Sequence, residues 1–74
     1  MNCREKMIDE FEKSIHTNTF YHTVTNLSNN YKQNNDDSIS EQDFLTVYFV
    51  LNDCNISIKE AFEIAKNFLI YGET

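Results

Sequence analysis

The chain has 74 residues and a net charge of −6, from 12 acidic and 6 basic side chains. These numbers predict one small acidic domain spanning residues 1–74. An acidic surface is repelled by phosphate groups, so we expect no direct binding of nucleic acid. The first residues are charged where a signal peptide needs an apolar run, and the longest apolar-rich run, residues 44–51, is far shorter than the ~20 residues of a membrane-spanning helix. We therefore expect a cytoplasmic protein without membrane contact, in which Cys3 and Cys54 stay reduced.

The sequence contains no proline and one glycine. Sheets and β-sandwiches need many tight turns, which these two residue types usually form. Their scarcity predicts an all-α fold, a small protein of three to four helices joined by polar loops.

Two helices are predicted in the N-terminal half, at about residues 3–16 and 20–31. In each, apolar side chains recur at the spacing of one helix face. In the first helix these side chains are Met7, Ile8, Phe11 and Ile15. In the second they are Phe20, Val24, Leu27 and Tyr31. Residues 28–38 are rich in Asn, Asp and Ser, which predicts a polar loop that begins within the end of the second helix.

A third helix is predicted at about residues 40–52. The segment Ser38-Ile39-Ser40-Glu41 has the pattern of a capping box, in which a serine hydroxyl and a glutamate carboxylate satisfy free backbone N–H groups. The run at residues 44–51 is rich in β-branched and aromatic side chains and by itself would also suit a strand. The cap and the absence of a partner strand favour a helix. Its expected apolar face consists of Phe44, Val47, Tyr48 and Leu51.

A fourth helix is predicted at about residues 57–71. Ser57-Ile58-Lys59-Glu60 is a second capping box, and Gly72 is a typical residue for ending the helix. The expected apolar face consists of Ile58, Ala61, Phe62, Ala65, Phe68 and Leu69. Because the link to the third helix is short, the last two helices should form a C-terminal antiparallel hairpin.

The last two helices carry more apolar side chains than one face accounts for. Ile64, Phe68 and Tyr71 form a second stripe on the fourth helix, and Phe49 lies at the edge of the polar side of the third. These residues either complete a four-helix core or bind a partner. In the second case Phe49, Ile64, Phe68 and Tyr71 would be the partner-binding residues, either in a homodimer or against another protein.

The chemistry-bearing residues are sparse. His16 and His22 are six residues apart, off the usual helical spacing of metal ligands, and neither Cys3 nor Cys54 belongs to a CxxC motif. A single glycine cannot form a phosphate-binding loop. We therefore expect no enzyme, no catalytic residues, no cofactor and no metal site.

The charge is concentrated before and within the third helix. The acidic patch consists of Asp36, Asp37, Glu41 and Asp43. The same region, residues 32–43, half matches a calcium-binding loop, but Lys32 stands at the first ligand position. The patch suits either a solvated loop leading into a capped helix or an imitation of DNA phosphates that blocks a nucleic-acid-binding enzyme.

The C-terminal half resembles the small biofilm and acid-resistance regulators of the YmgB/AriR type. The likeness lies in the segments Val24-Thr25-Asn26-Leu27, Ile39-Ser40-Glu41-Gln42-Asp43-Phe44-Leu45 and Ala61-Phe62-Glu63-Ile64. The resemblance covers about the last fifty residues, and the alignment needs a gap between the last two predicted helices. The resemblance implies an all-helical bacterial homodimer that modulates a signalling or transcription pathway.

Together these patterns predict a non-enzymatic regulatory protein that acts by protein–protein interaction in signalling or transcription. Two alternatives stay open from the sequence. One is an acidic inhibitor or decoy, of phage or plasmid type, directed at a nucleic-acid-binding enzyme. The other is a small secretion chaperone.

Overall fold

The computed structural model describes residues 2–17 and 19–71, and these form helices and connecting loops without any strand. The elements are α1 (Cys3–Thr17), α2 (Phe20–Asn34), α3 (Glu41–Leu51) and α4 (Ile58–Lys66), followed by the π-helical turn η1 (Asn67–Tyr71). The predicted all-α fold is confirmed. None of these helices has the length and apolar character that crossing a membrane requires.

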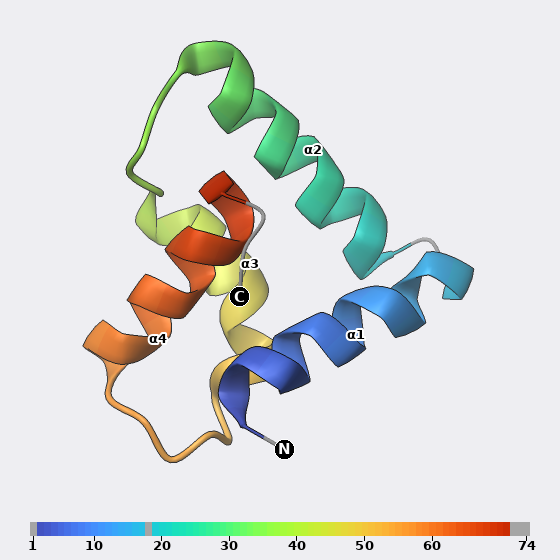
Figure 1. Cartoon of the computed structure of the whole chain (residues 1–74), viewed down its shortest axis with the longest axis vertical. Helices are drawn as coiled ribbons and strands as arrows, with labels where there is room; N and C mark the ends of the chain where they lie inside the picture. The colour runs from blue at the N-terminus through green and yellow to red at the C-terminus, as the bar shows by residue number, and fades with distance from the viewer. Residues whose placement is uncertain (1, 18, 72–74) are drawn as a thin grey trace.

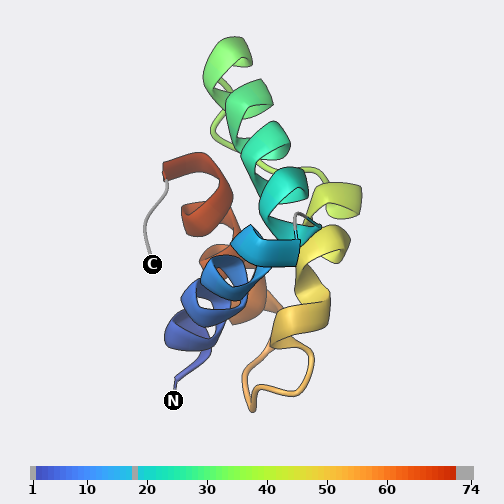
Figure 2. The same cartoon turned by 90° about the vertical axis from the view of Figure 1, so that its right-hand side faces the viewer.

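The helices are arranged around an open V. Figure 1 shows α1 and α2 as its two arms, with α3 and α4 in the opening between them. The chain reverses direction after α3, and α4 runs back across it, so the two helices form the expected hairpin (Figures 1 and 2). Further contacts join α1 to α2, α1 to α3, and α2 to η1. The molecule is thin, measuring 32 × 30 × 19 Å, so each helix keeps a face outside the core.

Both helices of the hairpin begin at a serine cap. The Ser57 hydroxyl accepts a hydrogen bond from the Glu60 backbone N–H at 3.1 Å, at the position that the sequence predicts. In α3 the cap is Ser40, which accepts from the Asp43 N–H at 3.1 Å. The prediction of Ser38 as the cap was wrong, because Ser38 instead donates its backbone N–H and its hydroxyl to Asp36 Oδ1.

Helix α2 is longer than the sequence predicts, and the polar loop is correspondingly shorter. Residues 28–34 are helical, and the helix ends only where Asn35 adopts a left-handed conformation with φ 53°. The reason is Tyr31, which is buried and whose backbone oxygen accepts the N–H groups of Asn35 and Asp36. Burial of this ring offsets the low helix propensity of the surrounding asparagines.

The C-terminal helix changes its winding before its end. Regular α-helix stops at Lys66, and residues 67–71 form the π-helical turn instead of the predicted α-helix. The Asn67 N–H is shared between the backbone oxygens of Glu63 and Ile64, as occurs where helix winding changes. The predicted cap at Gly72 lies outside the described residues.

The core gathers apolar side chains from every helix. Its most completely buried members are Met7, Val47, Leu51, Ala61, Ala65 and Leu69. Two expected core residues are outside, since Ile15 is 49% and Ile58 67% exposed. In α1 the buried position near the end belongs to Ser14, whose hydroxyl is satisfied by the Phe11 backbone oxygen at 2.7 Å. Ile58 is the first residue of α4, before the helix reaches the core.

Candidate functional site

An apolar hollow lies between α3 and α4. It encloses about 450 Å³. Its lining consists of Glu41, Phe44, Leu45, Tyr48, Ile58 and Phe62. We call it the hairpin groove. Five of its six lining side chains are apolar or aromatic, and Glu41 is the one charged group among them.

The groove has a rigid floor and an exposed rim. Phe44 is buried and its ring contacts those of Tyr48 and Phe62, with centroids 5.0 and 5.2 Å apart. Tyr48 and Phe62 are half-buried, whereas Leu45 is 55% and Ile58 67% exposed. Because the aromatic rings are held by one another, the groove exists before any partner binds.

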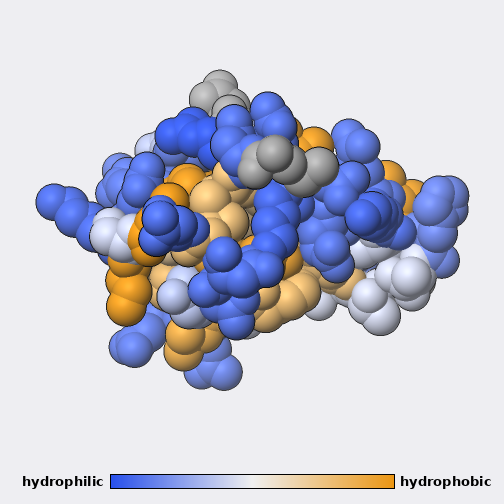
Figure 3. Space-filling view, turned by 90° about the horizontal axis from the view of Figure 1, so that it is seen from below, coloured by the Kyte–Doolittle hydropathy of each residue, from blue (hydrophilic) through white to orange (hydrophobic). Residues whose placement is uncertain are grey.

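Aliphatic and aromatic surface continues from the groove along the outside of α3. Phe49 lies one helical turn after Leu45 and is 54% exposed. Its ring contacts that of Phe20 of α2, with the centroids 5.2 Å apart in a T-shaped arrangement. Phe49 is thus the one predicted partner-binding residue that lies next to the hairpin groove on the same helix. Seen from below in Figure 3, apolar surface is exposed between the charged side chains.

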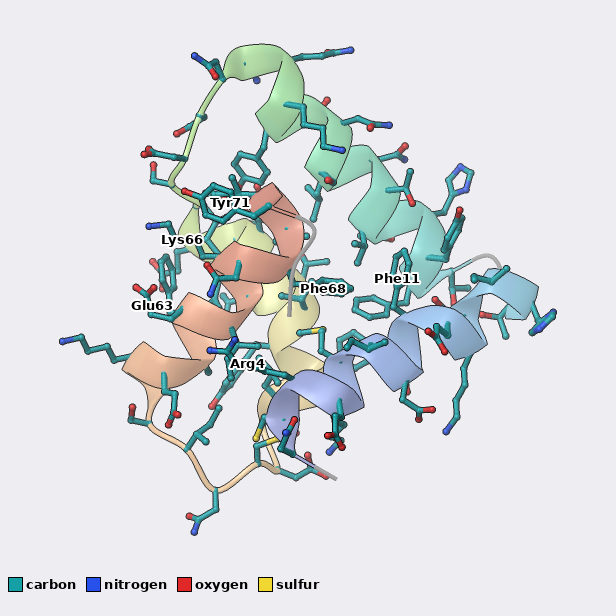
Figure 4. The ribbon with its side chains drawn as sticks, in the orientation of Figure 1. Arg4, Phe11, Glu63, Lys66, Phe68 and Tyr71 are labelled. Atoms are coloured by element: carbon teal, nitrogen blue, oxygen red, sulfur yellow. The ribbon has the colours of Figure 1, made fainter. Side chains whose placement is uncertain are left out.

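Two of the predicted partner-binding residues, Ile64 and Phe68, are instead buried in the core. Their exposed fractions are 4% and 9%. Phe68 and Phe11 pack in a T-shaped arrangement with a centroid distance of 5.4 Å, and Figure 4 shows the two residues side by side. Of the two alternatives that the sequence left open, these two residues complete the core, because Phe68 packs against Phe11 of α1 and η1 contacts α2.

Tyr71 is exposed as predicted, but it belongs to a different face. It is 52% exposed and lines a shallow hollow with Tyr31, Asp36 and Asp37 at the far end of α2. In Figure 4, Phe68 lies beside Phe11, whereas Tyr71 lies at the other end of η1. The four residues predicted as one binding surface therefore do not come together.

The acidic patch is also divided. Asp36 and Asp37 lie beside Tyr71, whereas Glu41 lines the hairpin groove. Asp43 accepts a hydrogen bond from the Tyr31 hydroxyl, which itself accepts the Ser40 backbone N–H at 3.2 Å. Burial, and then the bond to Asp43, raise the pKa of Tyr31 above its ordinary value. Part of the patch thus fastens α2 to the start of α3.

Another carboxylate outside the patch serves an internal contact. Asp53, after α3, forms an ion pair with Lys6 of α1. The hydrogen bond from Lys6 lowers the pKa of Asp53, and the same bond raises the pKa of Lys6. Both groups are solvent-exposed, so the pair mainly positions α1 against the hairpin loop at residues 52–57.

Only residues 35–40 of the half-matched calcium loop lie outside the helices. Asn34 is part of α2, and Asp43 lies in the first turn of α3 with its carboxylate bonded to Tyr31. Over residues 2–17 and 19–71, no three His, Cys, Asp or Glu side chains are grouped so that they could hold a metal ion.

Sequence reasoning missed the groove residues Leu45 and Ile58. Leu45 falls away from the main apolar face of its helix, and Ile58 was placed on the core side of the next one. An apolar residue on the polar side of a helix was the available signal at Leu45. The pairing of these two residues depends on how α3 crosses α4, which the sequence pattern does not give.

No family model, curated protein or solved structure matches the chain. The resemblance to the biofilm and acid-resistance regulators therefore stays a prediction.

Proposed function

We propose that this is a non-enzymatic regulatory protein that binds a partner protein through the hairpin groove. The observation that carries the proposal is the combination of a preformed aromatic floor with the exposed rim residues Leu45 and Ile58. Apolar and aromatic anchors in a concave site supply most of the binding energy in protein interfaces. A small modulator of a signalling or transcription pathway needs no more than such a surface.

The occupant that suits the groove is an amphipathic helix of the partner. The groove runs between two helices whose backbone groups are already hydrogen-bonded within each helix, so a partner strand would find no sheet edge to extend. Side chains from one face of a helix, spaced three and four residues apart, enter such grooves. The binding energy would then come from burying Leu45, Ile58 and their aromatic neighbours.

The charge of the chain favours a basic partner. Residues 36–53 carry five carboxylates and no lysine or arginine, and Glu41 stands in the groove itself. A helix with lysine or arginine next to its apolar face would be attracted to this side of the molecule. A second copy of the chain, which also has a net charge of −6, would be repelled at long range. We therefore propose a basic helix of another protein as the occupant of the groove, in preference to the homodimer that the sequence suggested.

The test uses a designed peptide as the probe. Its helix carries leucines on one face and lysines on the other, and a matched peptide carries glutamates in place of the lysines. Fluorescence anisotropy with the full chain should show binding of the basic peptide and weaker binding of the acidic one. Leu45→Asp and Ile58→Asp should each weaken binding of the basic peptide at least about tenfold.

Ile15→Asp is the matched control, because Ile15 is similarly exposed on α1 and does not line the groove. It should bind as the unaltered chain does, and all three variants should unfold at the same urea concentration as the parent. Equal loss of binding in Ile15→Asp, or no binding of either peptide, would refute the proposal. If the chain sediments as a dimer that Leu45→Asp dissociates, the occupant is a second copy and the partner helix is wrong.

An acidic decoy is the other function that the sequence left open. Asp36, Asp43 and Asp53 all have bonding partners within the chain, which leaves fewer carboxylates to imitate phosphates. A decoy would release its target almost completely as salt rises, whereas binding through the groove should keep the part of its affinity that comes from apolar contacts.

A further inference from the structure

The two cysteines of the chain lie against each other, although they are far apart in the sequence. Cys3 is the first residue of α1, and Cys54 lies in the loop between α3 and α4. Both are free thiols, both pack half-buried against the core, and the Lys6 side chain lies close enough to interact electrostatically with each of them. A pair of thiols in contact has a chemistry that a single buried cysteine lacks.

The surrounding structure keeps this contact in place. The ion pair between Lys6 and Asp53 joins the same two segments, one turn after Cys3 and one residue before Cys54. The backbone of the loop is also fixed, because the Cys54 N–H donates to the Leu51 oxygen at 3.0 Å and the Cys54 oxygen accepts from Ile56 at 2.9 Å. The thiols therefore meet through two anchored segments and not through a chance approach of a loose loop.

We propose that Cys3 and Cys54 are a redox-responsive pair that closes to an intramolecular disulfide by exchange with a small-molecule disulfide such as oxidised glutathione. Closure would join the start of α1 covalently to the hairpin loop. This inference is independent of the proposed binding surface, because neither cysteine lines the hairpin groove.

The exchange takes two steps. In the first, the thiolate of Cys3 attacks one sulfur of the small disulfide, forming a mixed disulfide and releasing one small thiol. In the second, the thiolate of Cys54 attacks the Cys3 sulfur and releases the second small thiol. The two protein thiols are oxidised, the small disulfide is reduced to two thiols, and the two protons leave with those thiols.

The surroundings of Cys54 indicate that it acts second. Burial, and then the hydrogen bond and charge of Cys3, raise the pKa of Cys54 to about 11, while Lys6 opposes and Asp53 adds to this rise. Once Cys3 is part of a mixed disulfide, its hydrogen bond and charge no longer oppose ionisation of Cys54. Burial still does, so the closing step should accelerate as pH rises.

Closure would stabilise the fold, because the cross-link spans residues 3–54 and so ties three of the four helices into one covalent loop. A loop of this size restricts the unfolded chain strongly. We expect the thermal midpoint to rise by about 10 °C or more. Reduction with a dithiol should return the midpoint to its starting value.

The experiment treats the full reduced chain with oxidised glutathione, blocks remaining thiols with an alkylating reagent, and measures intact mass and thermal unfolding. The expected product is a monomer that has lost two hydrogen atoms, takes up no alkylating reagent and melts at a higher temperature. Cys3→Ser and Cys54→Ser are the controls. Cys54→Ser should stop as a glutathione adduct, Cys3→Ser should react more slowly through Cys54, and neither should show the rise in midpoint.

Three results would overturn the proposal. The first is a parent chain that stops at the glutathione adduct, as Cys54→Ser does. The second is a disulfide that joins two chains, seen as a dimer on a non-reducing gel. The third is an internal disulfide that leaves the midpoint unchanged, which would show that closure does not fasten α1 to the hairpin.

Discussion

Replacing Tyr31 with phenylalanine tests the contact that joins the two halves of the chain. The hydroxyl of Tyr31 donates to the Asp43 carboxylate and accepts the Ser40 backbone N–H, so it links the end of α2 to the cap of α3. Tyr31→Phe keeps the buried ring and removes only these two bonds. Any loss of stability therefore comes from the hydroxyl and not from a cavity.

The expected loss is about 2 kcal/mol, since a hydrogen bond to a charged group contributes about 1.5–3 kcal/mol and removal leaves the Ser40 N–H without its partner. A domain of this size has roughly 3–5 kcal/mol of net stability. The thermal midpoint should consequently fall by about 8–16 °C. Urea unfolding followed by circular dichroism measures the change in free energy directly.

Tyr21→Phe is the matched control, because Tyr21 is on the same helix and its described contact is through its ring with Phe11. It should unfold close to the parent. A Tyr31→Phe chain as stable as Tyr21→Phe would show that the link between α2 and α3 contributes nothing, and the account of the shortened loop would fail with it. A double variant with Asp43→Asn should lose less than the sum of the two single changes.

The same contact predicts a pH dependence. The pKa of Tyr31 is raised in the folded protein, chiefly by burial, so the folded state keeps the neutral phenol where the unfolded chain would ionise it. This contribution is fully present below pH about 10, the ordinary pKa of tyrosine, and is lost as pH rises through the folded pKa. The stability difference between the parent and Tyr31→Phe should therefore narrow above pH 10. If the difference in unfolding free energy between the parent and Tyr31→Phe stayed constant from pH 7 to 11, the raised pKa of Tyr31 would be contradicted.

The remaining predictions concern the core and the helix caps. Phe68→Ala should remove about 3–5 kcal/mol and leave the chain largely unfolded by circular dichroism, whereas Phe49→Ala should cost about 1 kcal/mol. Equal effects would mean that Phe68 is not buried. Ser57→Ala should cost about 1 kcal/mol in urea unfolding because the Glu60 N–H loses its acceptor. Ser38→Ala, which removes no cap, should cost less than about 0.5 kcal/mol, and a larger loss there would contradict the placement of the α3 cap.

Local sequence patterns were sufficient for the helices themselves. The spacing of apolar residues, the scarcity of glycine and proline, and the serine cap at Ser57 all depend on groups within a few residues of each other. The errors arose where a distant residue intervened. Helix α2 continues through residues predicted as loop because Tyr31 is bonded to Ser40 and Asp43 across the turn. The cap of α3 is Ser40 and not Ser38, and the backbone N–H of Ser40 is bonded to the same Tyr31 hydroxyl.

The candidate site was predictable in kind but not in position. Helical periodicity determines which side chains share one face of one helix. It does not determine which face the other helices will cover, because that depends on the angles at which they cross. In this protein Ile64 and Phe68 are buried in the core, with Phe68 against Phe11 of α1, while the crossing of α3 and α4 leaves Leu45 and Ile58 exposed around an aromatic floor. The sequence by itself determined the helices and their apolar excess, and only the tertiary packing decided which part of that excess faces solvent.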